Sequence, residues 1–173
     1  MPDQESPLRE VVTAALSNDV VLLSGGTSKG AGDLSYRVVA DLPAPGIVAH
    51  GVALKPGKPI CLAATRIAED RPPVPVVILP GFPTSAVFTF HEFVAPVIRT
   101  LGGQLGGRTA SLAARLPVRV NSERGRTEYL LVNVVDGPHG LAAYPMGKGS
   151  GIQFRGRIRD HSPPMRSSMR TPT

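Results

Sequence analysis

Apolar residues recur at helical spacing in three stretches of the first hundred residues. At 8–16 and at 34–42 they fall on one face of a helix, and each stretch ends in a polar or proline-rich break. A longer pattern from Ser85 to Leu101 predicts a third helix, which a Ser or Thr side chain should cap and Pro96 should kink. The pattern therefore predicts three helices that each bury one face.

Short continuous apolar runs lie between these helices. Such runs, bounded by glycine and proline, are typical of strands that are buried in a sheet. They lie at 20–23, 47–54, 60–64 and 74–79. Helices and buried strands in this order predict an α/β fold with a mostly parallel sheet and flanking helices.

The pattern changes after a glycine-rich break at 102–107. Apolar and polar residues then alternate at 116–120 and 127–134, which predicts a hairpin, and 136–140 predicts a second turn before 141–146. We therefore expect a small antiparallel β module to follow the α/β part.

The net charge of +6 is concentrated at the end of the chain. Residues 152–173 hold five arginines and one aspartate, a net of +4, which leaves +2 for the other 151 residues. This tail is rich in Ser and Pro and has no hydrophobic period, so we expect it to be disordered. An α/β domain at 1–101 and a β domain at 108–151 form the near-neutral body. A role in binding nucleic acid is therefore not expected.

Composition adds two expectations. The single cysteine, Cys61, lies in an apolar stretch and is expected to be a buried structural thiol in a reducing compartment, the cytoplasm. No apolar run approaches the roughly 18 residues that a membrane span needs, so no membrane segment is expected.

The loop Ser24–Gly30 follows the first buried strand. Its glycines allow successive N–H groups to face an anion, and hydroxyls and Lys29 lie beside them. A tight strand-to-helix turn explains the same residues. Asp33, three residues later, fits either a helix N-cap or a carboxylate that faces the anion through a divalent cation.

Two further loops follow predicted strands. Lys55 and Lys58 lie on a turn that prolines stiffen, which suits anion binding, although a solvated charged turn is the alternative. Pro80–Ser85 precedes the third helix, whose N-terminus offers free N–H donors. The carboxyl ends of strands are where ligands bind in open α/β sheets. Together the three loops predict a site for an anionic ligand.

The four histidines share no spacing of metal ligands, and no Ser/His/Asp order suggests a catalytic triad. These two classes of active site are therefore not expected.

Three stretches together resemble the signature of the MoeA/gephyrin E-domain family, the molybdopterin molybdenumtransferases. They are SGGTSKGAGD at 24–33, HGVALKPGKP at 50–59 and LPGFPTSA at 79–86, and the resemblance extends from about Asp19 to Gly151. It implies the second part of a molybdopterin-binding domain and an activity that inserts molybdate into molybdopterin or adenylated molybdopterin. It also implies Mg²⁺ or a similar divalent cation, and a homodimer in full-length members.

The resemblance assigns roles to individual residues. It implies a catalytic and metal-binding role for Asp33 and catalytic roles for Lys55 and Lys58. Residues that are implied to bind molybdopterin are Ser24, Gly25, Gly26, Thr27, Ser28, Gly30, Pro80, Gly81, Pro83, Thr84 and Ser85. The stretches 125–128 and 147–151 resemble parts of the family's C-terminal domain.

The sequence also departs from the family pattern. Phe82 replaces the usual Asn of the third loop, and Lys29 stands where an apolar residue is common. Only the C-terminal portion of the family's sequence is present. After Gly151 an Arg/Pro/Ser tail replaces the expected strand, which suggests a frameshift or displaced stop codon. Alternative functions are molybdopterin adenylyltransferase, which shares the glycine loop, and a truncated, non-catalytic molybdopterin-binding fragment.

Overall fold

The structure is a computed structural model that describes residues 5–25, 32–104, 111–122, 124–146 and 155–156, with the backbone alone at 32–33 and 155–156. Its helices and strands follow one another as α1 (Glu5–Ala15), β1 (Val21–Ser24), α2 (Gly32–Ala40), β2 (Pro45–His50), β3 (Leu54–Lys55), β4 (Cys61–Thr65), β5 (Val74–Leu79), α3 (Pro83–Thr89), η1 (Phe90–Val94), α4 (Ala95–Leu101), β6 (Thr127–Glu128), β7 (Leu130–Val135), β8 (Ala142–Pro145) and β9 (Arg155–Gly156). The mixed α/β class that the sequence predicts is confirmed.

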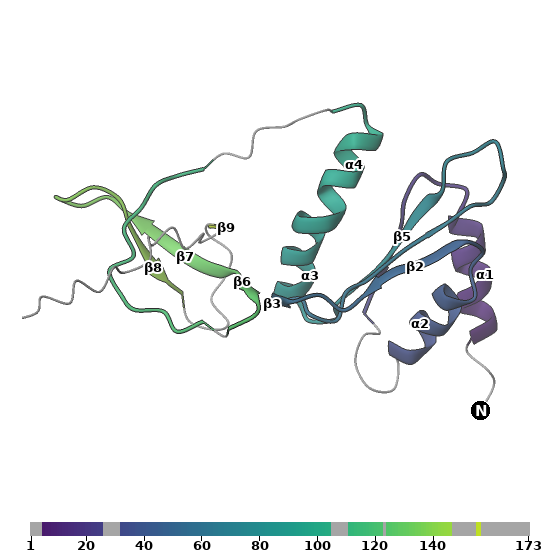
Figure 1. Cartoon of the computed structure of the whole chain (residues 1–173), viewed down its shortest axis with the longest axis horizontal. Helices are drawn as coiled ribbons and strands as arrows, with labels where there is room; N and C mark the ends of the chain where they lie inside the picture. The colour runs from purple at the N-terminus through teal and green to yellow at the C-terminus, as the bar shows by residue number, and fades with distance from the viewer. Residues whose placement is uncertain (1–4, 26–31, 105–110, 123, 147–154, 157–173) are drawn as a thin grey trace, which may run out of the picture. The chain divides into compact units, whose positions relative to one another are not determined.

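A four-stranded sheet in the order β1-β5-β4-β2 organises the first part of the chain (Figure 1). β1 pairs with β5 in parallel, and β4 is antiparallel to both of its neighbours, β5 and β2. Three strands therefore run in one direction, but only β1 and β5 are parallel neighbours. The expected mostly parallel arrangement fails at β4, because a short turn joins β4 to β5 and such connections produce antiparallel pairs.

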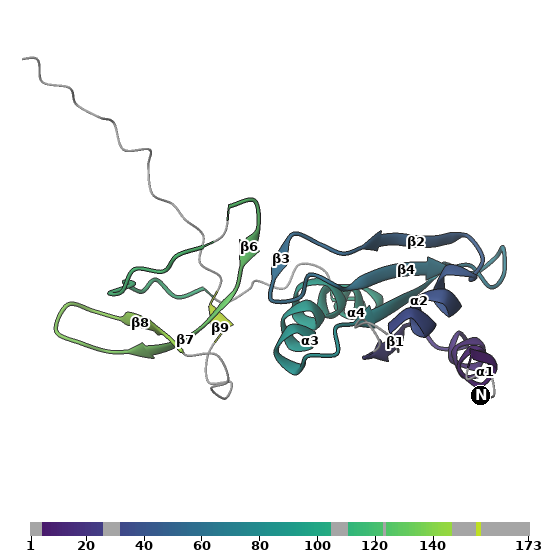
Figure 2. The same ribbon diagram turned by 90° about the horizontal axis from the view of Figure 1, so that it is seen from below.

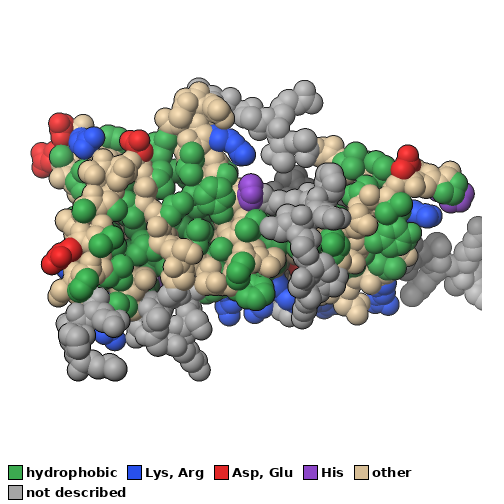
Figure 3. Space-filling view, turned by 180° about the vertical axis from the view of Figure 1, so that it is seen from behind, with side chains coloured by type: hydrophobic (Ala, Val, Ile, Leu, Met, Phe, Trp, Pro, Cys, Tyr) green, Lys and Arg blue, Asp and Glu red, His purple; other side chains and the backbone are tan. Residues whose placement is uncertain are grey.

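Helices cover both faces of this sheet. On one face, Leu16 after α1 and Val39 of α2 pack with Val76 and Ile78 of β5. On the other face, Val94 of η1 packs with Ile60, Val77 and Leu79, and Phe90 and Phe93 extend this core. The continuous apolar run of β5 is thus explained by burial on both sides. Other apolar side chains reach the surface among polar ones, as Figure 3 shows for the face viewed from behind.

The helical segment after β5 starts earlier than its predicted capping residue. It begins at Pro83, with Phe82 as N-cap and no side-chain cap hydrogen bond, so the predicted Ser or Thr cap is wrong. Proline suits the first helical turn because its missing N–H has no partner there in any case. The kink at Pro96 stays a prediction; the irregularity in the structure is the π-helical turn η1 at Phe90–Val94, which directly precedes α4.

Two compact units divide the chain. The first contains 1–110 and 121–128, and the second contains 111–120 and 129–173. In the first unit β6 pairs in parallel with β3, a contact visible in Figure 2. The predicted hairpin between 116–120 and 127–134 is therefore wrong, because residues 116–120 form no strand and Thr127–Glu128 pairs with β3 instead.

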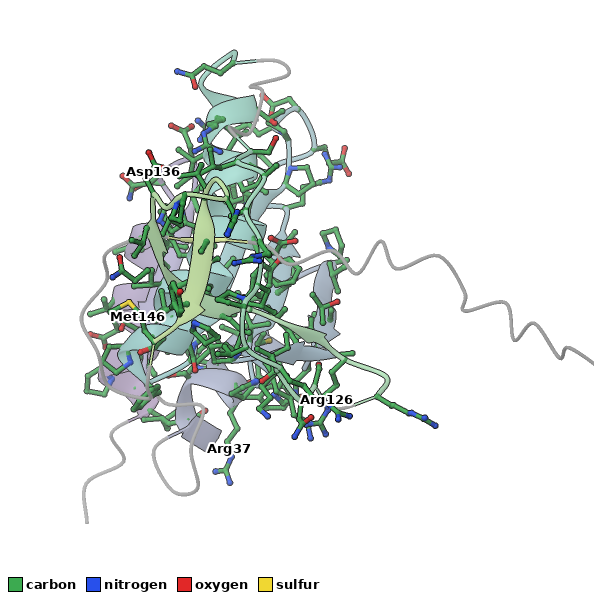
Figure 4. The ribbon with its side chains drawn as sticks, turned by 90° about the vertical axis from the view of Figure 1, so that its left-hand side faces the viewer. Arg37, Arg126, Asp136 and Met146 are labelled. Carbon is green, nitrogen blue, oxygen red and sulfur yellow. The ribbon has the colours of Figure 1, made fainter. Side chains whose placement is uncertain are left out.

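An antiparallel hairpin of β7 and β8 forms the centre of the second unit. Its turn at 136–140 confirms the predicted second turn, and Figure 4 shows Asp136 and Met146 at opposite ends of the hairpin. β9 also pairs with β7, so residues 155 and 156 of the predicted disordered tail form a strand. The rest of 152–173 and the stretch 147–151 lie outside the described residues. Within the described ranges, no helix has both the length and the apolar character needed to cross a membrane.

Cys61 lies at the start of β4 and is only 1% exposed, which confirms the predicted buried thiol. Burial raises the pKa of this thiol because the thiolate would lose its hydration. Since the thiolate is the nucleophile, we expect Cys61 to react with a thiol reagent at least about tenfold more slowly in the folded chain than in urea. Labelling rates at neutral pH measure this difference, and equal rates would contradict it.

Candidate functional site

The register of the four-stranded sheet brings the three predicted loops to one edge. Ser24, the last residue of β1, lies opposite Leu79, the last residue of β5. His50 at the end of β2 pairs with Cys61, and Cys61 pairs with Ile78. The chain therefore leaves β1, β2 and β5 at the same edge, which we call the loop edge.

Two of these loops lie beside each other at their glycines. A Cβ placed on Gly81 would lie 3.6 Å from the Cα of Gly25, an ordinary van der Waals distance for such an added atom. Gly25 also has a positive φ of 87°, a conformation that favours glycine. The backbone angle at Gly25 thus favours glycine, while the loops after β1 and β5 lie beside each other. Residues 26–31 of the first loop lie outside the described residues.

The lysine turn is fixed to the sheet by backbone hydrogen bonds. Gly51 N–H donates to the carbonyl of Ile60 at 2.8 Å, and Val52 N–H donates to that of Lys58 at 2.9 Å. These bonds prolong the β2–β4 pairing beyond the sheet. The turn between them carries Lys55, in β3, and the exposed Lys58.

Gly57, between the two lysines, anchors this turn on α3. It is buried and has a φ of 118°, and a Cβ at this position would overlap with Cγ2 of Thr89. Thr89 is itself fully buried, and its hydroxyl donates to the carbonyl of Ser85 at 2.9 Å. The lysine turn and α3 are therefore in direct contact, and only glycine fits between them.

Glu128 holds an ion pair that sequence reasoning missed. The parallel pairing of β3 and β6 places it opposite Lys55, and its Oε1 lies 3.4 Å from the Lys55 Nζ. The Glu128 side chain is 15% exposed, whereas that of Lys55 is 39% exposed. Glu128 belongs to the 125–128 stretch that carries the family resemblance, but nothing in the local pattern indicates its partner.

The loop after β5 presents residues of different accessibility. Pro80 is fully buried, so it shapes the turn and offers a ligand at most its backbone. Gly81, Phe82 and Pro83 are exposed, Thr84 is half-buried and Ser85 is buried. The first N–H groups of α3 have no side-chain cap, and such groups attract anions.

The start of α2 is the third group of backbone donors. Tyr36, one turn into α2, stacks on His50 at the end of β2, with ring centroids 4.5 Å apart. Because β2 ends at the loop edge, this contact brings the first turn of α2 toward the same edge. Asp33 begins this helix, but its side chain lies outside the described residues, as do Gly26, Thr27, Ser28 and Gly30.

The described residues do not by themselves form a site for Mg²⁺. Glu128 is the described carboxylate in contact with the lysine turn, and its Oε2 is buried and accepts no hydrogen bond within the described part of the chain. The ammonium group beside its other oxygen opposes a cation, and Mg²⁺ prefers several oxygen ligands. No three His, Cys, Asp or Glu side chains gather at a metal-binding distance among the residues described.

A second concave site lies in the other unit. It is a hollow of about 150 Å³ lined by Arg115, Asp136, His139 and Tyr144, among others. Pockets for small molecules are usually at least about twice this volume. None of the predicted binding residues lies there, so the loop edge is the better candidate. Its lysines, uncapped helix N–H groups and glycine backbones suit an anionic ligand.

Several known proteins resemble this chain. The profile of a family described as "Probable molybdopterin binding domain" matches residues 1–100. A molybdopterin molybdenumtransferase from Nostoc sp. is 33% identical over 161 residues, which are 90% of this chain and 35% of that protein. Gephyrin from Dictyostelium discoideum is 33% identical over 115 residues, 60% of this chain and 16% of that protein.

A solved structure also resembles the chain. It is a molybdenum cofactor biosynthesis protein from Pyrococcus furiosus, with a TM-score of 0.59 and 26% identity, and the match covers 88% of this chain and 45% of that one. The chain spans about a third or less of the length of the two curated relatives.

Proposed function

This chain belongs to the family of molybdopterin-binding domains, together with molybdopterin molybdenumtransferases and gephyrin, and from this premise we propose that it acts in molybdenum cofactor biosynthesis. Its substrate is molybdopterin or its adenylated form, and its reaction is the insertion of molybdate. The convergence of the three loops at one edge of the sheet is the observation that carries the proposal.

The chemistry of the loop edge suits these substrates. Molybdopterin has a phosphate and a dithiolene, and molybdate is an oxyanion, so the reactants repel each other in water. Lys55 and Lys58 supply two positive charges on a turn that contacts α3. Fixed cations and N–H groups reduce this repulsion and need little reorganisation when the reactants meet.

Each group has a distinct part in this proposal. The glycine backbones at Gly25 and Gly81 and the first turn of α3 bind the phosphate. Lys58, which is exposed, and Lys55, which Glu128 orients, bind the anionic groups of molybdopterin and the incoming oxyanion. Asp33 keeps its proposed catalytic role at the start of α2. The two partial domains proposed from the sequence, 1–101 and 108–151, complete this assignment.

A binding titration tests the proposal on the full 173-residue chain. We expect saturable binding of molybdopterin that weakens as salt is added, because charges carry the affinity. Molybdate should then be incorporated when adenylated molybdopterin is supplied. The decrease in free molybdate measures this incorporation. A chain that binds no molybdopterin at low salt would disprove the proposal.

A second candidate is a role in which this chain binds molybdopterin but does not insert molybdate. The match covers 35% of the Nostoc relative. Binding of molybdopterin without incorporation of molybdate would favour this non-catalytic role. Formation of adenylated molybdopterin from ATP would instead favour the adenylyltransferase.

A further inference from the structure

The ring of Phe82 stands in solvent at the loop edge. Its exposed fraction is 68%, whereas Phe88 is buried and Phe90 and Phe93 pack against the core between the sheet and η1. Single exposed apolar residues are common on protein surfaces, and Figure 3 shows others. Exposure alone therefore does not make Phe82 a functional residue.

The position of Phe82 in its helix is the second observation. It is the N-cap of α3, has extended backbone angles and forms no side-chain cap hydrogen bond. Ser, Thr, Asp and Asn are preferred at this position because they bond to the first helical N–H groups. Phe82 gives up that bond and leaves its ring in water, and no contact in the described part of the chain offsets these two costs.

The surroundings of Phe82 show what would offset them. The preceding residue, Gly81, lies beside the backbone of Gly25, and the following residues form the first turn of α3. The lysine turn contacts the same helix through Gly57 and Thr89. A ligand ring that stacked on Phe82 would therefore place a neighbouring anionic group near the uncapped N–H groups of α3.

We propose that Phe82 is a specificity-determining residue that stacks against a planar heteroaromatic ring of the ligand. The inference rests on the proposed function, which supplies such a ligand in two forms. The ring is the pterin of molybdopterin or the adenine of its adenylated form. Aromatic side chains bind both by face contact, which tolerates differences in ring substituents.

Three substitutions at Phe82 test this role. Phe82→Ala removes the ring, Phe82→Leu keeps an apolar side chain without a flat face, and Phe82→Trp keeps a flat face. Because the residue is exposed, all three variants should fold, and circular dichroism checks this. We expect Phe82→Ala and Phe82→Leu to weaken molybdopterin binding about tenfold and Phe82→Trp to retain it, since stacked rings contribute this much.

Three simpler probes separate the parts of the ligand. They are a pterin without phosphate, AMP, and inorganic phosphate. Binding of the pterin is measured by the quenching of its fluorescence. We expect Phe82→Ala to weaken the binding of the pterin or of AMP. The probe whose binding is weakened identifies the ligand ring that stacks on Phe82. Phosphate binding should not change. An equal loss of phosphate binding would show that Phe82 only shapes the anion loop and would overturn the inference.

The outcomes distinguish this inference from the proposed function. If the natural chain binds molybdopterin and Phe82→Ala binds it equally well, the stacking role is wrong and the proposed function stands. If the natural chain binds none of the four compounds, both fail.

Discussion

Replacing Gly57 with alanine is expected to lower the free energy of unfolding by about 2–6 kcal/mol. The backbone at this position has a φ of 118°, which costs a residue with a side chain about 1–3 kcal/mol. The added methyl would also overlap with Cγ2 of Thr89 inside the contact between the lysine turn and α3, and overpacking costs about another 1–3 kcal/mol. Urea denaturation followed by circular dichroism measures the sum.

Two further variants separate the backbone cost from the steric one. Gly103→Ala has a milder backbone constraint, because its φ of 75° lies near the left-handed helical region, and nothing lies within 4 Å of its added Cβ, so it should lose only a smaller, backbone part. Thr89→Ser removes the overlapping methyl and keeps the hydroxyl that donates to Ser85. Added to Gly57→Ala, it should restore part of the lost stability. Equal losses for Gly57→Ala and Gly103→Ala would show that the overlap has no effect.

Removing both lysines of the turn is expected to weaken molybdopterin binding about 100-fold. Hydrogen bonds to charged groups contribute about 1.5 kcal/mol or more each, and about 1.4 kcal/mol corresponds to a tenfold change in affinity. Titrations of Lys55→Met, Lys58→Met and the double variant against the natural chain measure the effect. Each single variant should lose about tenfold.

Arg71→Gln is the control with the same change in charge. Arg71 is exposed on the turn between β4 and β5, at the edge of the sheet opposite to the loop edge, so its removal should change binding less than about twofold. Lys55→Met leaves the carboxylate of Glu128 without its ion pair with Lys55, which can destabilise the fold. If this variant unfolds, the double variant Lys55→Met/Glu128→Gln replaces it, because it removes the unpaired carboxylate as well. Equal losses for Arg71→Gln and Lys58→Met would refute specific binding at the lysine turn.

The local pattern of apolar and polar residues is sufficient to predict most helices and strands of the first unit. The run at 74–79 was predicted with the bounds of β5, because six apolar residues between prolines admit few other structures. The helices at 8–16 and 34–42 were predicted within a few residues of α1 and α2, since each buries one face against the sheet. Their ends differ because helix boundaries depend on individual capping contacts.

Long-range pairing was not predictable from the same pattern. Residues 116–120 alternate like a strand, yet they find no partner strand in the structure, whereas Thr127–Glu128 pairs with distant β3. A strand is stabilised by its neighbours, so alternation alone cannot identify the pair. The same reason explains why Glu128 was missed at the candidate site.

The candidate site was predicted in outline from the strand-end loops. Their convergence follows from strand direction, and it required only the order of elements. The accessibility of single side chains did not follow from the sequence. Pro80 was expected to contact a ligand but is fully buried, while the exposed ring of Phe82 was read only as the loss of an asparagine.

The pairing of β3 with β6 has a consequence for the order in which the molecule folds. The hairpin of β4 and β5 closes a short loop, and its contacts can form as soon as that segment is made. The β3–β6 pair closes a much longer loop that contains β4, β5 and the whole α3–η1–α4 segment, and long loops cost more entropy to close. We therefore expect Lys55 to meet Glu128 late in folding, so that the candidate binding residues reach their final arrangement only after the sheet that supports them has formed.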